Sequence, residues 1–351
     1  MYSWEQRKFG DLFEYERPDA YIVKSDNYNN DFNMPVLTAN KAFILGYTNE
    51  ENSYNKPSII FDDFTLDRKY VDFPYMLKSS AIKILTSKNQ HNLRFLFERL
   101  NSTRFEVLGH ARHYISVVQN TTTLCPSVDE EVCISNLLTK FNELITLHQR
   151  KLDNLKLKKK ALLQKLFPKN GERYPELRFP GFTDAWEQRK LGDFTNQINT
   201  FVNPEDAKLP LWSLTAEAGL IEKSDRYERD FLVKKKDQFK RIETNTLVYN
   251  PMNITIGSID IYTGLYPIAV SGYYVSIVYD KNIDTDFLKE VLLLPSSLKM
   301  YKNYATGSLI ERQRVQYPTF SKLQLLLPNL DEQKAIGQLF KSLNLNITLH
   351  Q

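Results

Sequence analysis

The stretch Trp4-Glu-Gln-Arg-Lys-Phe-Gly-Asp11 returns 182 residues later as Trp186-Glu-Gln-Arg-Lys-Leu-Gly-Asp193, with one difference in eight positions. A second pair, Pro126-Ser-Val-Asp-Glu-Glu-Val-Cys-Ile134 and Pro328-Asn-Leu-Asp-Glu-Gln-Lys-Ala-Ile336, is offset by 202 residues. The pentapeptide Ile-Thr-Leu-His-Gln follows at 145–149 and again at 347–351. An internal repeat of this kind indicates two structural units that share an opening and a closing segment.

Between the shared segments lie two bodies, roughly 12–125 and 194–327, which show no obvious sequence similarity. Each has short β-branched and aromatic runs that predict strands, with one helix candidate, at 92–100 in the first body and 287–294 in the second. A common frame around divergent bodies indicates one scaffold that carries two different specificities.

The closing segment of each unit carries the seam of a coiled coil. After Pro126, apolar residues recur at alternating spacings of four and three for over four heptads, with His148 and Lys159 as polar exceptions. Because such a seam needs a partner helix, we expect the two closing helices to pack antiparallel. The seam residues are Ile134, Leu138, Phe141, Ile145, Leu152, Leu155, Leu162 and Leu166 in the first copy and Ile336, Phe340, Leu343 and Ile347 in the second.

The two predicted closing helices differ in length. The first, 130–167, would reach about 57 Å, whereas the second, 330–351, would reach about 33 Å. We therefore expect Leu155, Leu162 and Leu166 to lack seam partners within the chain. A second copy, another subunit or a separate fragment would then cover them, because several exposed leucines cost about 1.5–3 kcal/mol each relative to burial.

Composition narrows the class of protein. A chain of 351 residues suits two domains, and a net charge of +4 means that positive charge for a polyanion must be concentrated on particular faces. The two cysteines, Cys125 and Cys133, match neither a zinc site nor a disulfide framework. Without an apolar leader or a run long enough to span a bilayer, we expect a cytoplasmic protein.

Polar and aromatic residues in the loops of the bodies are candidates for DNA contact. Arginine and lysine can bond guanine, asparagine can bond adenine, and all of them can hold phosphate. For any single position the alternative is an ordinary polar surface side chain. The candidates are Lys41, Tyr47, Arg68, Lys69, Lys78, Arg112 and His113 in the first body and Tyr249, Asn250, Asn253, Ser271, Tyr273, Lys302, Tyr304, Ser308, Arg312 and Arg314 in the second.

A self-contained DNA methyltransferase or nuclease is the enzymatic alternative, and the sequence disfavours it. The nearest match to an adenine-holding loop, Asn250-Pro-Met-Asn253, lacks the second proline and the aromatic residue. No Gly-x-Gly turn follows a predicted strand and no phosphate loop is present, so we assign no catalytic or metal-binding residue. A coiled-coil assembly protein without DNA specificity is the third interpretation. A DNA pull-down would distinguish it from a DNA-reading protein.

The repeated openings, the Pro-x-x-Asp-Glu-(Glu/Gln) helix starts and the segment Leu177-Arg-Phe-Pro-Gly-Phe182 resemble those of Type I restriction–modification specificity subunits. The resemblance implies an α+β fold with two α/β target-recognition domains in pseudo-twofold arrangement, linked by long antiparallel coiled-coil helices. The implied parts are a first recognition domain at 1–128, a central conserved helix at 129–167, a linker at 168–185, a second recognition domain at 186–329 and a shortened C-terminal conserved helix at 330–351.

The same resemblance implies a function. Such a subunit is non-catalytic, reads a bipartite, asymmetric site in double-stranded DNA, and docks two modification (methyltransferase) subunits, which restriction (translocase–nuclease) subunits join. S-adenosylmethionine, ATP and Mg²⁺ would belong to those partner subunits, so no cofactor is expected in this chain and no membrane partner is implied.

Overall fold

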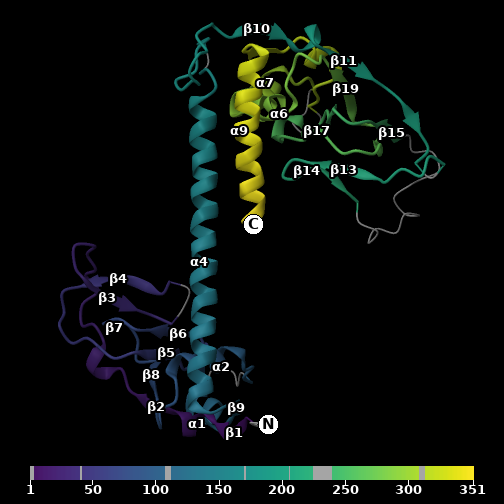
Figure 1. The fold of residues 1–351 in the computed structure, drawn as a ribbon. Coiled ribbons are helices and arrows are strands. Elements are labelled where there is room, and N and C mark those ends of the chain that lie inside the picture. The colour runs from purple at the N-terminus through teal and green to yellow at the C-terminus, as the bar shows by residue number, and fades with distance from the viewer. Residues whose placement is uncertain are drawn as a thin grey trace. The chain divides into compact units, whose positions relative to one another are not determined.

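A computed structural model describes most of the chain, as residues 4–39, 42–106, 112–169, 171–204, 206–223, 239–307 and 313–351. The chain divides into two compact units, unit 1 at Met1–Leu147 and unit 2 at His148–Gln351, and the long helix α4 (Val128–Lys165) contributes residues to both. Figure 1 labels the elements. The mixture of sheets and helices confirms the expected α+β class, and each unit is described by itself below.

Unit 1 is built from three small sheets. The shared opening and closing segments form the first, in which β1 (Glu5–Lys8) pairs antiparallel with β9 (Thr122–Cys125). The four-stranded sheet has the order β2 (Phe13–Glu16), β8 (Ile82–Ser87), β5 (Ser58–Asp62) and β6 (Arg68–Val71). The third has the order β4 (Ile44–Thr48), β3 (Met34–Leu37) and β7 (Met76–Leu77). The helices beside α4 are α1 (Phe9–Leu12), α2 (Leu93–Ser102) and α3 (His113–Ser116).

Strand β5 shows why this sequence forms a central strand. All five of its residues are buried, because alternate side chains of a strand point to opposite faces and both faces are covered here. Ile59 and Phe61 pack with α2, whereas Ile60 packs toward the third sheet. The apolar run at 58–61 is therefore a strand between two layers of core.

Unit 2 shares with unit 1 the pair of opening and closing strands and the order of the four-stranded sheet, and it differs in its smaller sheets. Its opening and closing strands are β10 (Glu187–Lys190) and β20 (Gln324–Leu327), again antiparallel. The four-stranded sheet has the order β11 (Thr195–Ile198), β19 (Val275–Tyr279), β16 (Thr246–Tyr249) and β17 (Ile259–Tyr262). The remaining strands are β12 (Phe201–Val202), β15 (Phe239–Ile242), β18 (Ile268–Ser271), β13 (Trp212–Thr215) and β14 (Gly219–Glu222). The helices are α6 (Thr285–Leu292), α7 (Pro295–Tyr304), α8 (Tyr317–Phe320) and α9 (Leu330–Leu349).

The order of elements shows that the two bodies share one helix with a similar sequence. Helix α2 follows β8 and helix α6 follows β19, each after the same strand of its four-stranded sheet. Both helices carry Phe-Leu-x-Glu-x-Leu, at 95–100 and at 287–292. Their N-cap side chains, Asn92 and Asp284, each accept a hydrogen bond from the backbone N–H three residues later, at 2.9 Å. The interpretation that the bodies share no sequence is therefore wrong for this helix.

The repeated start of the closing helix has a structural role in both units. In unit 1 the carboxylate of Glu131, fully buried, accepts hydrogen bonds from the backbone N–H of Asn92 at 2.8 Å and pairs with the His91 ring at 2.8 Å. In unit 2 the side-chain oxygen of Gln333, at the equivalent position, accepts from the backbone N–H of Asp284 at 3.0 Å. The closing helix thus holds the N-terminus of the body helix in each copy.

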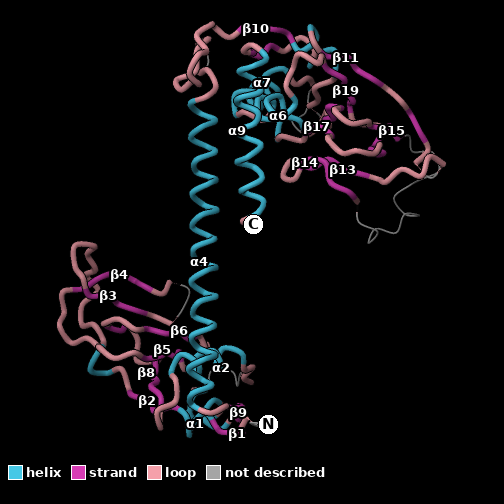
Figure 2. The backbone as a smooth tube through the Cα atoms, in the orientation of Figure 1, coloured by secondary structure: helices cyan, strands magenta, loops and turns pink. Residues whose placement is uncertain are grey.

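Helix α9 packs antiparallel on the C-terminal half of α4 within unit 2, as Figure 2 shows. The Nδ1 atoms of His148 and His350 lie 3.1 Å apart, and Lys159 Nζ lies 2.8 Å from Asn344 Oδ1. The ring of Phe167 lies 6.0 Å from the ring of Phe340. Residue numbers therefore rise along one helix as they fall along the other, as the antiparallel expectation requires.

This pairing overturns the expectation about the uncovered leucines. Leu166 is 3% exposed, and Leu155 and Leu162 pack against the same core, so the prediction that they lack partners is wrong. The large apolar seam residues left exposed are Phe141 at 53% and Ile145 at 66%. The direction of α9 explains this difference. Because α9 is antiparallel to α4 and its C-terminal end lies beside His148, it covers the part of α4 that leads to residue 167 and not the part near residue 141.

Both cysteines are free thiols, Cys125 buried and Cys133 exposed. Burial raises the pKa of the Cys125 thiol to about 11. In the described part of the chain, no three histidine, cysteine or acidic side chains are grouped as metal ligands. No helix there is both long enough and apolar enough to cross a membrane.

Candidate nucleic-acid interface

In unit 2 the backbone brings several predicted contact residues to one surface. Paired hydrogen bonds of 2.9 Å between Thr306 and Arg314 join the end of α7 to the segment that precedes α8. The backbone N–H of Val315 donates to Pro251 O at 3.0 Å, which adds the turn between β16 and β17. The Arg314 guanidinium lies 5.8 Å from the centre of the Tyr273 ring. We call the group Asn253, Tyr273, Lys302, Tyr304 and Arg314 the unit 2 interface.

The unit 2 interface has the chemistry that nucleic acid requires. All five side chains are exposed, so their polar and aromatic groups are accessible. Lysine and arginine can hold phosphate or a guanine edge, and asparagine can bond adenine. Tyr273 and Tyr304 present rings on which an unstacked base or a sugar can pack.

Two other predicted residues of the second body serve turns. The side-chain oxygen of Asn250 accepts a hydrogen bond from the backbone N–H of Met252 at 3.1 Å, and its backbone N–H donates to Ser258 O at 3.0 Å. The hydroxyl of Ser271 accepts from the backbone N–H of Tyr273 at 3.4 Å, in the turn between β18 and β19. Asn250 therefore stabilises a turn, and Ser271 positions Tyr273.

The predicted residues of unit 1 do not form a single group. Tyr47 lines a groove of about 390 Å³ together with Met34, Ile44 and Phe73. Lys78 is ion-paired with Asp26, and the hydrogen bond to that carboxylate raises the pKa of Lys78. This edge of the third sheet offers apolar surface and one cation that is already neutralised.

Arg68 lies on a different part of unit 1 and is held by the protein. Its Nε donates to Asn101 Oδ1 at 2.8 Å, and its guanidinium lies 5.6 Å from the centre of the Phe105 ring. Burial lowers the pKa of Arg68. Lys69 and Arg112 are exposed and remain candidates for DNA contact.

The structure contradicts two of the predicted contacts. His113 and Tyr249 are both 0% exposed. The His113 ring bonds Asp63 O at 3.0 Å, and the Tyr249 ring stacks on Phe320 at 4.9 Å. Burial raises the pKa of the Tyr249 hydroxyl. Reading these side chains as surface contacts is wrong because both pack inside their cores. Lys41, Ser308 and Arg312 lie outside the described residues.

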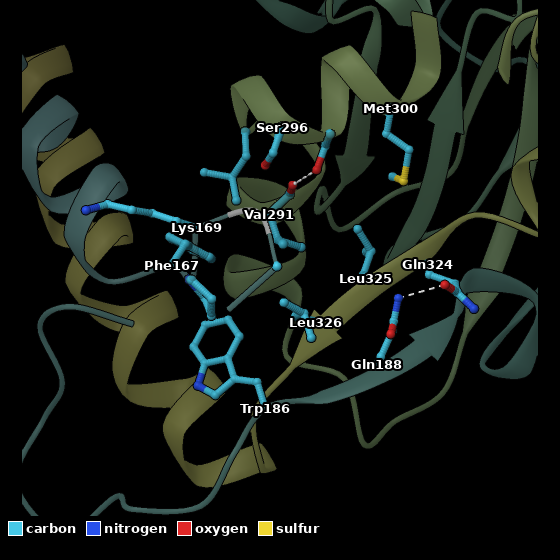
Figure 3. Close-up of a pocket in the computed structure, with 14 residues that line it drawn as sticks. Phe167, Lys169, Trp186, Gln188, Val291, Ser296, Met300, Gln324, Leu325 and Leu326 are labelled. Carbon is cyan, nitrogen blue, oxygen red and sulfur yellow. Dashed lines mark hydrogen bonds between the residues drawn. The ribbon is translucent and has the colours of Figure 1, made fainter. Parts of the chain in front are cut away.

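A cavity of about 210 Å³ lies in unit 2 between the strands β10 and β20 and the helices α6 and α7 (Figure 3). Its floor is Trp186, whose ring meets Phe167 edge-on at 5.8 Å, and one side is closed by the 2.7 Å hydrogen bond from Gln188 to Gln324. Lys169 is the single ionisable residue among the side chains that line it. The cavity therefore offers packing space and no acid–base pair.

Comparisons with known proteins match part of the chain to a family. Residues 1–157 match the family model of the Type I restriction modification DNA specificity domain. The EcoR124I/EcoR124II specificity subunit of Escherichia coli is 44% identical over 115 residues, which cover 30% of this chain and 28% of that protein. The match thus spans less than a third of the length of that relative.

One solved structure shows that the chain shares a known fold, and a second is reported beside it. The S subunit of a Type I restriction-modification system from M. genitalium has a TM-score of 0.65 at 12% identity, over 99% of this chain and 91% of that chain. The HsdS subunit from Thermoanaerobacter tengcongensis has a TM-score of 0.43 at 13% identity, over 99% and 90%. Residues 1–157 thus belong to the family of the Type I restriction modification DNA specificity domain, as the repeated segments predicted.

Proposed function

We propose that this chain reads a bipartite, asymmetric site in double-stranded DNA, with one half-site for each body. The observation that carries the proposal is a duplicated frame, with the same order in the four-stranded sheet of both units, that presents different side chains. Unit 2 offers Tyr304 and Arg314 at its surface, whereas unit 1 offers Lys69 and Arg112. One scaffold with two unlike contact surfaces is what an asymmetric, two-part target needs.

The chain acts in this proposal as the non-catalytic specificity subunit of a Type I complex. Two modification subunits dock on its helices and supply methyl transfer with S-adenosylmethionine, and restriction subunits that use ATP and Mg²⁺ join them. The site of Asn250 supports this assignment, because its side-chain oxygen is bonded to the Met252 N–H in a turn. A methyltransferase would need that group to hold the adenine amino group.

A body exchange tests the proposal. The chain is expressed with its modification subunits in a host that lacks other methyltransferases, and the methylated sites are mapped by sequencing. Replacing residues 12–125 with the body of another specificity subunit should change one half-site and leave the other half-site as it was. A change in both half-sites, or in neither, contradicts independent reading by the two bodies.

A further inference from the structure

One buried lysine of unit 2 holds a turn of the unit 2 interface. Lys240 lies in β15 and is 4% exposed, and its ammonium donates a hydrogen bond to Tyr274 O at 2.7 Å. Burial lowers the pKa of Lys240. Within the described part of the chain, no carboxylate lies close enough to form an ion pair with this ammonium. Lys240 is therefore a buried cation whose hydrogen-bond acceptor is a backbone carbonyl.

Strand pairing explains where this lysine lies. In the sheet of β12, β15 and β18, Lys240 stands directly opposite Phe201 on one side and Val270 on the other. Residues directly opposite each other in antiparallel strands share a face of the sheet, so the three side chains form one row. Val270 belongs to the core, whereas the ring of Phe201 is 52% exposed and its centre lies 5.6 Å from the ammonium. The row thus runs from a core residue to a surface ring, with Lys240 between them.

The turn between β18 and β19 presents Tyr273 at the surface. The side chain of Tyr273 is exposed, and the Arg314 guanidinium lies 5.8 Å from the centre of its ring. The next residue, Tyr274, is held at two atoms. Its carbonyl accepts a hydrogen bond from Lys240 at 2.7 Å, and its hydroxyl accepts one from the backbone N–H of Leu214 at 3.5 Å. Because the peptide bond between the two tyrosines is planar, fixing Tyr274 also restricts the direction in which Tyr273 points.

Unit 1 contains a buried lysine in a different environment. Lys83 is also 4% exposed, and its ammonium lies 3.7 Å from the carboxylate of Asp63, whose side chain is 2% exposed. A buried ammonium beside a carboxylate is compensated, whereas one that meets only a carbonyl has lost its hydration without gaining a counter-ion. We therefore expect Lys240 to lower the stability of the folded chain, so stabilising the fold does not account for it.

We propose that Lys240 is a positioning residue for the half-site that unit 2 reads. Its ammonium holds the turn between β18 and β19, which fixes Tyr273 and, through the ring of Tyr273, the guanidinium of Arg314. Fixing these groups before DNA binds lowers the entropy that is lost on binding and sharpens the discrimination between bases. The inference rests on the proposed function, because Tyr273 and Arg314 belong to the unit 2 interface. Lys240 itself acts from inside unit 2 and does not touch DNA.

Substitution of Lys240 tests this role. Lys240→Met keeps a side chain of similar length and removes both the charge and the hydrogen bond to Tyr274 O. The variant is assembled with its modification subunits, and methylated sites are mapped by sequencing after the body exchange has assigned one half-site to unit 2. The preference for the native sequence of that half-site should fall about tenfold, as for one lost base contact, and the other half-site should not change. Lys240→Arg keeps the charge and the donors and should retain most of the preference.

Melting temperature separates positioning from a structural role. Lys240→Met should melt at the temperature of the native chain or above it, because no counter-ion compensates the buried ammonium. Lys83→Met is the matched control. It removes an equally buried lysine and leaves Asp63 without its partner, so it should melt lower and read the half-site of unit 2 as the native chain does. Tyr274→Phe removes the second contact that holds the turn and should relax the same half-site by a smaller factor than Lys240→Met.

Salt dependence separates positioning from direct contact with phosphate. Each lost phosphate contact reduces the slope of log affinity against log salt concentration by about 0.9. Fluorescence anisotropy of the assembled complex with a labelled duplex measures this slope. Lys240→Met should leave the slope unchanged, and it should weaken binding to the native site more than binding to an unrelated sequence.

Four results would contradict this role of Lys240. If Lys240→Met keeps the native preference while the native complex reads a two-part site, the proposed function stands and Lys240 has no part in it. A smaller salt slope with equal weakening on every sequence would make Lys240 a phosphate contact. A melting temperature lowered as far as that of Lys83→Met, with native reading by Tyr274→Phe, would make Lys240 a structural residue. A native complex that reads no two-part site would overturn the proposed function and this role together.

Discussion

The two halves of α4 carry one heptad pattern and meet different environments. Leu155 and Leu162 pack against the core of unit 2, whereas Phe141 and Ile145 are more than half exposed. Apolar residues at heptad spacing therefore specify a surface able to pair, without specifying where along the helix the partner lies. That position is decided by directional contacts such as the ion pair between Lys159 and Glu290.

Truncating one phenylalanine in each environment gives the largest expected contrast. Phe340→Ala should lower the free energy of unfolding of unit 2 by about 3–5 kcal/mol, because a fully buried ring leaves a cavity. Phe141→Ala, on the exposed half of the seam, should change stability by less than about 0.5 kcal/mol. Urea denaturation followed by far-UV circular dichroism measures both. Equal losses for the two variants would mean that the seam at Phe141 is covered in the free chain.

The start of the closing helix carries a charged side chain, Glu131, in unit 1 and a neutral one, Gln333, at the equivalent position in unit 2. We therefore expect the stability of unit 1 to depend more on the hydrogen bond from Asn92 than on the charge of Glu131. Glu131→Ala should cost about 2–3 kcal/mol, because it leaves the partly buried N–H of Asn92 without an acceptor and breaks the pair with His91. Glu131→Gln should cost less, since glutamine already makes the equivalent bond from position 333 in unit 2. Thermal melting of the three proteins checks the order. If Glu131→Gln is as damaging as Glu131→Ala, the pair with His91 outweighs the backbone contact.

The junction of α4 and α9 should weaken in mild acid. Partial burial, followed by the charges of Lys151 and His148, lowers the pKa of His350 below its ordinary value. The folded state then binds fewer protons than the unfolded state near that value, so stability from this group is present above about pH 6.5 and is lost as pH falls through the lowered pKa. His350→Gln should flatten the dependence of melting temperature on pH between about 5 and 7. An unchanged slope would contradict the assignment to His350.

Much of the architecture is readable from the repeat itself. The duplicated opening and closing segments predict two units with closing helices, and the heptads predict antiparallel packing. The lengths of the two closing helices do not show which half of α4 is covered, because that depends on the direction in which α9 runs from His350. The Phe-Leu-x-Glu-x-Leu match is not aligned by either shared segment, because its offset, from Phe95 to Phe287, falls between theirs.

The candidate contacts were predictable as residue types more than as positions. Arg314 and Tyr273 meet because a backbone pairing between 306 and 314 folds the chain back, which no local pattern indicates. Tyr249 and His113 have polar tips on bulky rings, so composition places them equally well at a surface or in a core. Tertiary packing decides between these alternatives, and here it buried both.

Reading of one half-site by each unit is the central claim, and paired variants in the assembled complex test it most directly. The double variant Tyr304→Ala, Arg314→Ala removes two exposed groups of unit 2, and Lys69→Ala, Arg112→Ala is its counterpart in unit 1. Each lost base contact should cost about 1–3 kcal/mol in discrimination. Sequencing of methylated sites should show relaxed specificity in one half-site for the first double variant and in the other half-site for the second. Relaxation of the same half-site by both, or unchanged specificity in both, would contradict the account.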